Sequence, residues 1–388
     1  MITFRKGLLV AVCILTFYYL LLPSIRGTPV PSDRESANAL GKSPSDSAPK
    51  GKVTARPNLN PTSSWKAKPR TQGEGKVAGQ QTLQDSRELP LREQLAYQFP
   101  YDVGGKFPGY IWQTWKYTPS SRHFEEQYRA AEASWTEHHP GFVHEVITDL
   151  VAVPLLKHLY ASVPTVLEAY KALPLPILKA DFFRYLILLA RGGIYTDIDT
   201  SALKPAPEWV PQAVPRSSFG LVIGIEADPD RPDWHEWFSR RIQFCQWTIQ
   251  AKPGHPVLRE IVASITEDTL KRKAEGRLAE AVKSIVEFTG PALWTDIVFA
   301  YLNNPAYFDM GKSEQNITVE NFFNIKEAKK VGDVVVLPIT SFSPGIKTMN
   351  AGEPEDPMAF VKHDFEGTWK PEVERHIGEI FDENGNQQ

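Results

Sequence analysis

The stretch 179–199 carries the strongest hydrophobic pattern of the folded part of the chain. From 182 to 190 every residue except Arg184 is apolar or aromatic, and a helix that is hydrophobic nearly all round belongs inside a large core. Gly192 and Gly193 are expected to end this helix, because glycine adopts the positive φ at which helices stop. Apart from Asp197, residues 194–198 are β-branched or aromatic, and they predict a strand.

Two carboxylates close this stretch. Side chains two apart in a strand share a face, so Asp197 and Asp199 are expected to point the same way, with Ile198 opposite. Ligands of open α/β sheets bind at the carboxyl ends of strands, and paired carboxylates there predict a site for a hard divalent cation. The alternative is an acidic strand end solvated by water. A second D-x-D, Asp228 to Asp230 in a predicted loop, shows that the triplet alone is a weak signal.

The remaining pattern alternates strands with helices, which is the order of a parallel, doubly wound α/β sheet. The predicted strands cover 107–116, 142–148, 194–198, 219–225 and 334–337. The predicted helices cover 124–137, 155–160, 166–173, a segment ending near 270, a charged amphipathic segment at 274–288, and 292–302.

The first hundred residues have a different pattern. Sixteen residues without a charge, 7–22, follow Arg5-Lys6, and no small-residue cleavage site comes after them. We therefore predict a cytoplasmic tail at 1–6 and an uncleaved transmembrane signal anchor at 7–25. Residues 26–99 are rich in Pro, Ser, Gly, Lys and Gln and predict a flexible stem. A folded domain at 100–375 and a polar tail at 376–388 complete the expected organisation.

Composition and charge narrow the functional classes. The chain has 388 residues, of which 42% are hydrophobic, and a formal net charge of −3. Residues 100–388 hold 29 basic and 39 acidic groups, and an acidic folded part argues against a nucleic-acid partner. Of the two cysteines, Cys13 lies in the apolar N-terminal segment, so Cys245 has no partner for a disulfide within the folded part.

Other candidate residues each have two readings. Asp181 and Arg184 lie three apart on the predicted helix and share a face, either as a structural ion pair or as a grip on a phosphate and on sugar hydroxyls. Trp112 and Trp115 are either core residues or a stacking platform for a nucleotide base. His363 is a candidate third ligand for a manganese-type ion. The chain contains no G-x-S-x-G, P-loop or G-x-G-x-x-G motif, which argues against hydrolases, NTPases and dinucleotide-binding enzymes.

Four motifs, taken together and in order, resemble glycosyltransferase family 32, the D-x-D glycosyltransferases of the fungal initiation-specific α-1,6-mannosyltransferase group. They are I-W-Q-T-W-K at 111–116, D-x-x-R…G-G-I-Y-x-D-x-D at 181–199, T-G-P at 289–291 and H…G-T-W at 363–369. The resemblance covers roughly residues 105–370. Trp112 departs from the histidine common in relatives, and Thr368 from a commoner serine.

The resemblance implies a GT-A-type fold, Rossmann-like, with a mostly parallel sheet flanked by helices. It implies the donor GDP-mannose and a Mn²⁺ (or Mg²⁺) ion, with Asp199 as a direct metal ligand beside Asp197 and His363. The catalytic residues that it implies are Asp197, Asp199, Asp181 and Arg184. The residues that it places around the nucleotide sugar are Trp115, Gln113, Thr114, Asp181, Arg184, Tyr195 and Asp197.

The function implied is that of a single-pass type II Golgi membrane enzyme with a lumenal catalytic domain. Such an enzyme transfers mannose with retention, in α-1,6 linkage, to N-glycan cores of glycoproteins, and a Golgi mannosyltransferase complex is a further candidate partner. In the lumen, the sequon at Asn316 would be usable. Three alternatives remain: mannosylation of inositol phosphoceramide or another glycan, a non-catalytic lectin-like subunit, and a glycosidase. The last needs two carboxyl groups about 5 Å or more apart across a bond, and the sequence identifies no such pair.

Overall fold

The computed structural model describes residues 88–229, 232–308 and 316–367. The chain divides into two units, Met1–Val53 and Thr54–Gln388, and all described residues belong to the second. The predicted anchor at 7–25, the tails at 1–6 and 376–388, and Thr368 and Trp369 lie outside the described residues.

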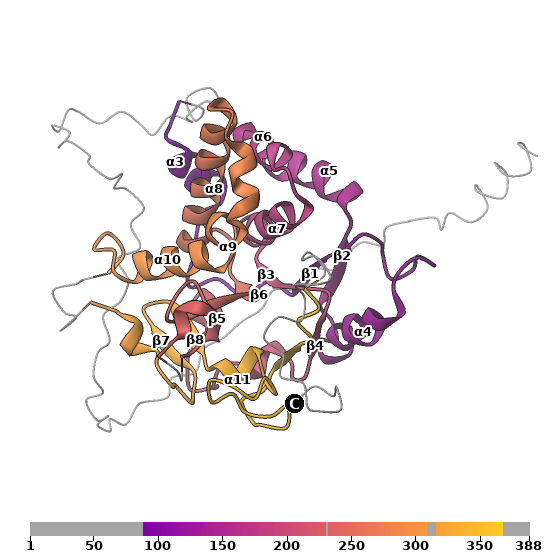
Figure 1. Ribbon diagram of the computed structural model, residues 1–388, viewed down its shortest axis with the longest axis vertical. Helices are drawn as coiled ribbons and strands as arrows, with labels where there is room; N and C mark the ends of the chain where they lie inside the picture. Colours follow the sequence, from indigo (N-terminus) through magenta and orange to yellow (C-terminus); the bar gives the residue numbers. More distant parts are fainter. Residues whose placement is uncertain (1–87, 230–231, 309–315, 368–388) are drawn as a thin grey trace, which may run out of the picture. The chain divides into compact units, whose positions relative to one another are not determined.

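A seven-stranded mixed sheet in the order β2-β1-β3-β6-β5-β8-β7 forms the centre of the fold (Figure 1). Three neighbouring pairs are parallel (β2 with β1, β1 with β3, β5 with β8) and three are antiparallel (β3 with β6, β6 with β5, β8 with β7). The strands are β1 (Tyr110–Thr114), β2 (Val143–Ile147), β3 (Gly193–Thr196), β5 (Leu221–Ala227), β6 (Gln243–Ala251), β7 (Lys329–Val331) and β8 (Val334–Leu337). A second, two-stranded sheet pairs β4 (Thr200–Ala202) with β9 (Val361–His363).

The expected α/β class is confirmed, but the expectation of a mostly parallel, doubly wound sheet is wrong. In its described residues, the connection from β5 to β6 holds the short 3₁₀ turn Trp234–Glu236 and no α-helix. A parallel neighbour needs a crossover connection, usually a helix, so β6 returns beside β5 in the antiparallel direction. It thereby enters the centre of the sheet between β3 and β5.

Helices cover both faces of the sheet, each over its own apolar core. The helices are α3 (Leu91–Gln98), α4 (Arg129–His138), α5 (Asp149–Leu159), α6 (Pro164–Ala172), α7 (Pro176–Arg191), α8 (Pro256–Ala274), α9 (Ile285–Phe288), α10 (Pro291–Leu302) and α11 (Ile339–Phe342). In Figure 1, α3, α6, α7 and α10 gather around α8 on one face, while α4 and α11 lie on the other. The first core lies under α7, α8 and α10, and the second lies under α4 and α11. Alternate residues of a strand face different cores: in β3, Tyr195 belongs to the first core and Ile194 to the second. The prediction of one amphipathic helix at 274–288 is wrong. Gly276 (φ +69°) ends α8, and a 3₁₀ helix, Leu278–Lys283, then precedes the short helix α9.

Helix α7 confirms the expected buried helix. Ten of its sixteen residues are buried, and Pro176 starts it at the first helical position, where a missing N–H costs nothing. Gly192 ends it at φ +64°. A Cβ atom on Gly192 would lie 2.8 Å from the carbonyl oxygen of Ala251, and one on Gly193 would lie 2.6 Å from that of Tyr110. The Gly-Gly pair is therefore required both by conformation and by the close approach of neighbouring strands.

Helix α3 shows that the folded part begins before residue 100, inside the segment expected to be stem. Leu95 is fully buried. The guanidinium of Arg92 donates to both carboxylate oxygens of Glu260 on α8, at 2.8 and 2.7 Å. Burial and this paired hydrogen bond hold α3 against α8, so the folded domain includes at least Leu91–Gln98.

One helical stretch among the described residues, Ile285–Leu302, is long and apolar enough to cross a membrane. Within the fold, however, 56% of it is buried, and Trp294 and Val298 belong to the first core. Core helices often meet the same length and hydropathy criteria, so this stretch is weak evidence for a span.

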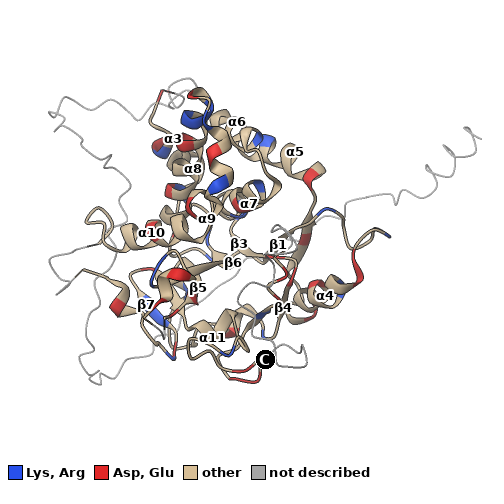
Figure 2. Ribbon diagram, in the orientation of Figure 1, with Lys and Arg blue, Asp and Glu red and all other residues tan. Residues whose placement is uncertain are grey.

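The charged residues of the described part lie mainly on helices and loops (Figure 2). The two central strands β3 and β6 carry no charged residue. The carboxylates that follow β3 therefore emerge from an apolar layer, where burial makes an uncompensated charge costly.

Asp333 is a fully buried carboxylate between β7 and β8. It accepts hydrogen bonds from the hydroxyls of Tyr101 (2.5 Å) and Tyr301 (2.9 Å), and Nε2 of His255 lies 3.4 Å away. Burial opposes its ionisation, but His255 and the hydroxyl donors outweigh burial and lower the pKa of Asp333 to about 2. The carboxylate thus ties the segment before β1 to α8 and α10.

We expect Asp333 to make stability depend on pH below about pH 4. Its folded-state pKa is lower than its unfolded value, so its contribution is fully present above the unfolded pKa and is lost as pH falls from about 4 to about 2. A difference of nearly two pKa units corresponds to about 2.5 kcal/mol. Urea unfolding of the wild type and of Asp333→Asn across this pH range should show that their free energies of unfolding converge as the pH falls. A difference in free energy that does not change with pH would contradict the lowered pKa of Asp333.

Candidate functional site

The D-x-D carboxylates lie in a turn and not in a strand. β3 ends at Thr196, and the turn that follows leads directly into β4. The Asp197 N–H donates to the carbonyl of Trp247 at 2.8 Å, and the Asp197 carbonyl accepts from the hydroxyl of Thr200 at 2.6 Å. The expected strand at 194–198 is therefore two residues too long, because Thr200 closes a tight turn with its side chain.

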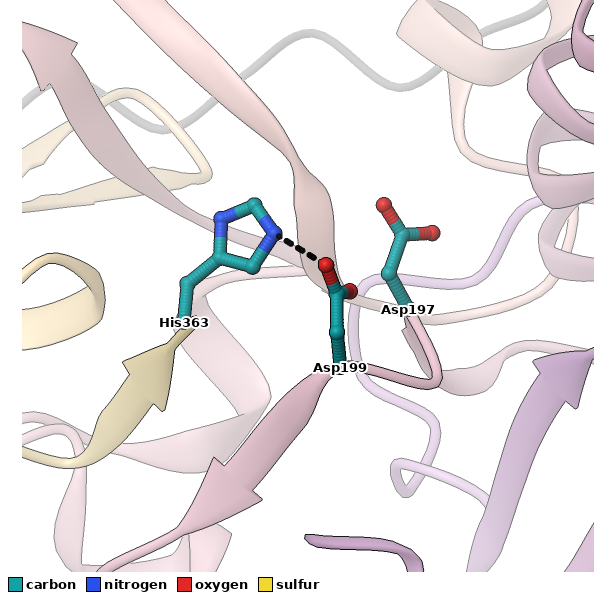
Figure 3. A group of neighbouring side chains, drawn as sticks. All are labelled: Asp197, Asp199 and His363. Atoms are coloured by element: carbon teal, nitrogen blue, oxygen red, sulfur yellow. Dashed lines mark ion pairs between the residues drawn. The ribbon is translucent and has the colours of Figure 1, made fainter. Parts of the chain in front are cut away.

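This turn brings the two predicted carboxylates together with His363 (Figure 3). One ligand atom from each of Asp197, Asp199 and His363 lies within 4.8 Å of the others. Nε2 of His363 is 3.3 Å from Oδ2 of Asp199. β9 delivers the histidine, because it pairs antiparallel with β4 and places His363 opposite Thr200. We call Asp197, Asp199 and His363 the acidic trio.

The chemistry of the acidic trio fits a divalent cation. Burial raises the pKa of Asp197, and the Asp199 charge raises it further, against the lowering effect of Arg184. Burial acts in the same direction on Asp199, but His363 and hydrogen bonds from backbone N–H groups together outweigh burial and lower the pKa of Asp199. Nδ1 of His363 is buried and has no hydrogen-bond partner within the described ranges. Two carboxylates and an imidazole are ligands suited to Mn²⁺ or Mg²⁺.

Arg184 connects helix α7 to the acidic trio. Its Nη2 lies 2.8 Å from Oδ1 of Asp181 and 3.5 Å from Oδ1 of Asp197, and its Nη1 donates to the carbonyl of Gln246 at 2.8 Å. The guanidinium also stacks over the ring of Tyr195 at 4.9 Å. The structural ion pair with Asp181 is therefore present, and the same arginine also neutralises charge at the D-x-D turn.

Asp181 and Arg184 are closed off from solvent in this structure, with side chains only 1% and 3% exposed. Thr289 donates to the second oxygen of Asp181 at 2.8 Å, and the amide of Gln246 donates to the first at 3.1 Å. Burial raises the pKa of Asp181 to about 6, against the lowering effect of Arg184. The observed contacts make the pair a support for Asp197, and contact with a donor sugar stays a prediction.

The β1 residues divide between core and site. Trp112 is a core residue, 8% exposed, whose indole N–H donates to the Gly192 carbonyl at 2.9 Å. Gln113 is fully buried, and its amide donates to the Asp197 carbonyl at 3.1 Å. The hydroxyls of Thr114 and Tyr195 lie 3.0 Å apart. Tyr195 is also fully buried, so Gln113 and Tyr195 support the D-x-D turn from its buried side.

Trp115 follows β1 directly and is only partly buried. Its indole N–H donates to Glu125 at 2.7 Å, and its ring meets Tyr128 edge to face at 4.8 Å. Both rings belong to the small apolar cluster around Ile198, the middle residue of the D-x-D. Trp115 therefore borders the D-x-D turn at Ile198, and its role at a nucleotide base stays a prediction.

Several residues that sequence reasoning did not assign to the site support it. His144 hydrogen-bonds to Thr136 of α4 at 2.9 Å through Nδ1 and to Gln113 at 2.9 Å through Nε2. Burial lowers the pKa of His144 to about 4, so at neutral pH one ring nitrogen donates and the other accepts. The chain of hydrogen bonds runs from α4 through Gln113 to the carbonyl of Asp197.

Strand β6 supplies the other unassigned residues. Gln246 contacts both Asp181 and Arg184, and the ring of Trp247 lies 4.6 Å from that of His363. Neither residue carried a sequence signal, because no strand was assigned to 240–249. Thr289, which donates to Asp181, belongs to the T-G-P motif. This motif was identified in the sequence, but no role was predicted for Thr289.

Comparison with known proteins adds a family. The profile of the family described as "Glycosyltransferase sugar-binding region containing DXD motif" matches residues 125–215. This match includes the D-x-D turn, Asp181 and Arg184, and ends well before His363.

Three curated fungal proteins, each described as an initiation-specific alpha-1,6-mannosyltransferase, are similar over most of the chain. The protein of Candida albicans is 47% identical over 306 residues, which cover 74% of this chain and 80% of that protein. The protein of Schizosaccharomyces pombe is 44% identical, covering 71% of this chain and 66% of that one. The protein of Saccharomyces cerevisiae is 35% identical, covering 74% and 83%.

Proposed function

The chain belongs to the fungal initiation-specific α-1,6-mannosyltransferases of glycosyltransferase family 32, and from this premise we propose that it transfers mannose from GDP-mannose to N-glycan cores. We propose further that transfer forms an α-1,6 linkage, retains the anomeric configuration and depends on Mn²⁺ or Mg²⁺. Its mixed sheet with helices on both faces fits the expected GT-A-like α/β fold.

The observation that carries this proposal is the acidic trio beside a buried arginine. Asp197 and Asp199 come from the turn after β3, and His363 comes from β9, more than 160 residues later. A divalent cation, when bound, neutralises charge that develops on a departing nucleoside diphosphate. Asp199, Asp197 and His363 are the residues that would hold such an ion.

The buried residues around the trio have a positioning task in this proposal. Arg184 keeps Asp197 oriented through the 3.5 Å contact, and its Nε is a buried donor with no partner in the described part of the chain. That N–H needs an acceptor, and an oxygen of the donor sugar or phosphate would supply one only by entering this closed region. Donors fixed in advance in a dry site stabilise developing charge without reorganising.

We propose a front-face transfer, because the carboxylates nearest the trio already have other partners. Asp181 accepts from Thr289 and Gln246, and the two D-x-D carboxylates belong to the metal site. The bond between the anomeric carbon and the phosphate oxygen breaks, the acceptor oxygen bonds to that carbon, and the acceptor proton passes to the leaving diphosphate. A sugar trapped covalently on an Asp or Glu would contradict this route.

The membrane context is proposed from the sequence. A signal anchor at 7–25 would make the protein a single-pass type II Golgi enzyme with its catalytic domain in the lumen. Asn316, in the sequon, is exposed, as an acceptor for glycosylation in that compartment needs to be.

The purified full-length protein offers a direct test. We expect it to transfer sugar from GDP-mannose, and not from UDP-glucose or UDP-N-acetylglucosamine, to an oligomannose glycan. EDTA should abolish transfer and Mn²⁺ should restore it, because ion binding depends on the acidic trio. Transfer that survives EDTA would contradict the metal role. Transfer only to inositol phosphoceramide would replace the proposed acceptor, and glycan binding without any transfer would favour a lectin-like subunit.

A further inference from the structure

The segment 228–242 connects β5 to β6, and its described residues, 228–229 and 232–242, have no part in the donor and metal contacts described above. It leaves the sheet at Ala227 and returns at Gln243, and these residues pair across the two antiparallel strands. Further along the same strand, Thr248 lies opposite Thr196, immediately before the D-x-D turn. The segment therefore rises from the edge of the sheet that carries the acidic trio.

Arg240 fastens this segment beside the site. Its guanidinium donates to both oxygens of Asp296, at 2.7 and 2.6 Å, and to both oxygens of Glu287, at 3.0 and 2.9 Å. Two residues after Glu287, Thr289 donates to Asp181 at 2.8 Å. Two residues of chain span at most about 7 Å. The ion pair between Arg240 and Glu287 therefore lies close to Thr289 and Asp181, which support the acidic trio.

Contacts near both ends hold the segment in place. The guanidinium of Arg241 lies over the ring of Phe323 at 4.4 Å. At the other end, the backbone N–H of Asn324 donates to Asp228 at 2.7 Å. A segment held in this way loses less conformational freedom when a ligand binds to its tip.

The residues 235–237, which we call the tip of the segment, include a large aromatic ring among polar groups. The side chain of Trp237 is 49% exposed, and its neighbours His235 and Glu236 are also exposed. An uncharged sugar has apolar C–H faces that stack on an indole ring and hydroxyl groups that hydrogen-bond to nearby polar side chains. Both described arginines of the segment are already engaged, Arg240 with two carboxylates and Arg241 with the ring of Phe323.

We propose that Trp237 is a stacking platform for a sugar of the oligomannose acceptor, outside the donor and metal site. The inference rests on the proposed function, since a glycan acceptor must approach this edge of the sheet for transfer to occur. Trp237 would thus determine acceptor affinity without contacting the reacting atoms.

The test compares Trp237→Ala and the conservative Trp237→Phe with Tyr97→Ala, which removes a ring of similar exposure, 58%, on α3. Direct binding of an oligomannose glycan is measured by calorimetry in the absence of donor. The KM for the glycan is measured with GDP-mannose, and donor hydrolysis is measured without acceptor. We expect Trp237→Ala to weaken glycan binding and raise the acceptor KM about tenfold, equivalent to about 1.4 kcal/mol, with hydrolysis unchanged.

The conservative variant should keep most of the affinity, within about threefold of wild type, because a phenyl ring still stacks. Tyr97→Ala should match the wild type. Glycan affinity and KM unchanged in Trp237→Ala would overturn the proposal, and that is also the result expected if the ring covers a protein surface. Absence of all donor turnover in the wild type would instead count against the proposed function, and the calorimetric comparison would still decide the role of Trp237.

Discussion

Asp199→Asn is expected to lower the rate of mannose transfer about a thousandfold, equivalent to about 4 kcal/mol of transition-state stabilisation. The amide keeps the size of the side chain but removes the charge nearest His363, whose Nε2 lies 3.3 Å from the carboxylate. The fold should survive, because in the absence of an ion the substitution also removes repulsion between two neighbouring carboxylates.

A matched control is available in the same segment of the chain. Asp364→Asn removes a carboxylate that follows His363 directly and is 37% exposed. It forms an ion pair with the exposed Lys362 at 2.7 Å. The variant should retain full activity. Addition of Mn²⁺ should raise the melting temperature of the wild type and of Asp364→Asn but not that of Asp199→Asn, because ligand binding stabilises the folded state by mass action. A wild-type rate of mannose transfer in Asp199→Asn would show that Asp199 is not part of the active site.

Arg184→Met is expected to have the largest effect on stability. The substitution keeps a long apolar stem but leaves Asp181, 1% exposed, without its cation. Removing one partner of a buried ion pair costs about 3 kcal/mol or more, since the remaining charge stays buried. Asp197 also loses its 3.5 Å contact with the guanidinium, so transfer should fall together with stability.

The double variant Asp181→Asn with Arg184→Met separates these two effects. With both charges of the pair removed, neither position leaves an uncompensated buried charge, and more than half of the lost free energy of unfolding should return. Activity should not return, because Asp197 still lacks its support. Urea unfolding and transfer assays on the two single variants and the double variant supply the measurement. Strictly additive stability losses would show that the pair is not coupled.

Local sequence pattern was sufficient for the central helix and its end. The apolar run in α7 has one stable environment, a core, and Gly192 and Gly193 are required where the next strands approach within 2.8 Å and 2.6 Å of a would-be Cβ atom. Such features depend on side-chain chemistry and backbone conformation over a few residues. For the same reason the positions of β1, β2 and β8 were predicted to within a few residues at each end.

The candidate site was predictable in its residues but only partly in its geometry. Asp197, Asp199 and His363 were expected together and lie together, although the carboxylates are gathered by a turn and not by the pleat of a strand. Gln113, expected to border the nucleotide, donates to the carbonyl of Asp197, and its contact with a nucleotide stays a prediction. Gln246 was not expected in the site, since its place depends on the pairing of β6 with β3.

By itself the sequence determined the class of fold, the buried helix before the D-x-D, and the residue types able to bind a cation. The tertiary structure alone decided three arrangements: the antiparallel β6 in the centre of the sheet, the β4–β9 pair that delivers His363, and the closure of Asp181 and Arg184 from solvent. The reason is physical. Helix periodicity and glycine turns depend on neighbours in the chain, whereas the partner and direction of a strand depend on hydrogen bonds between segments far apart in sequence.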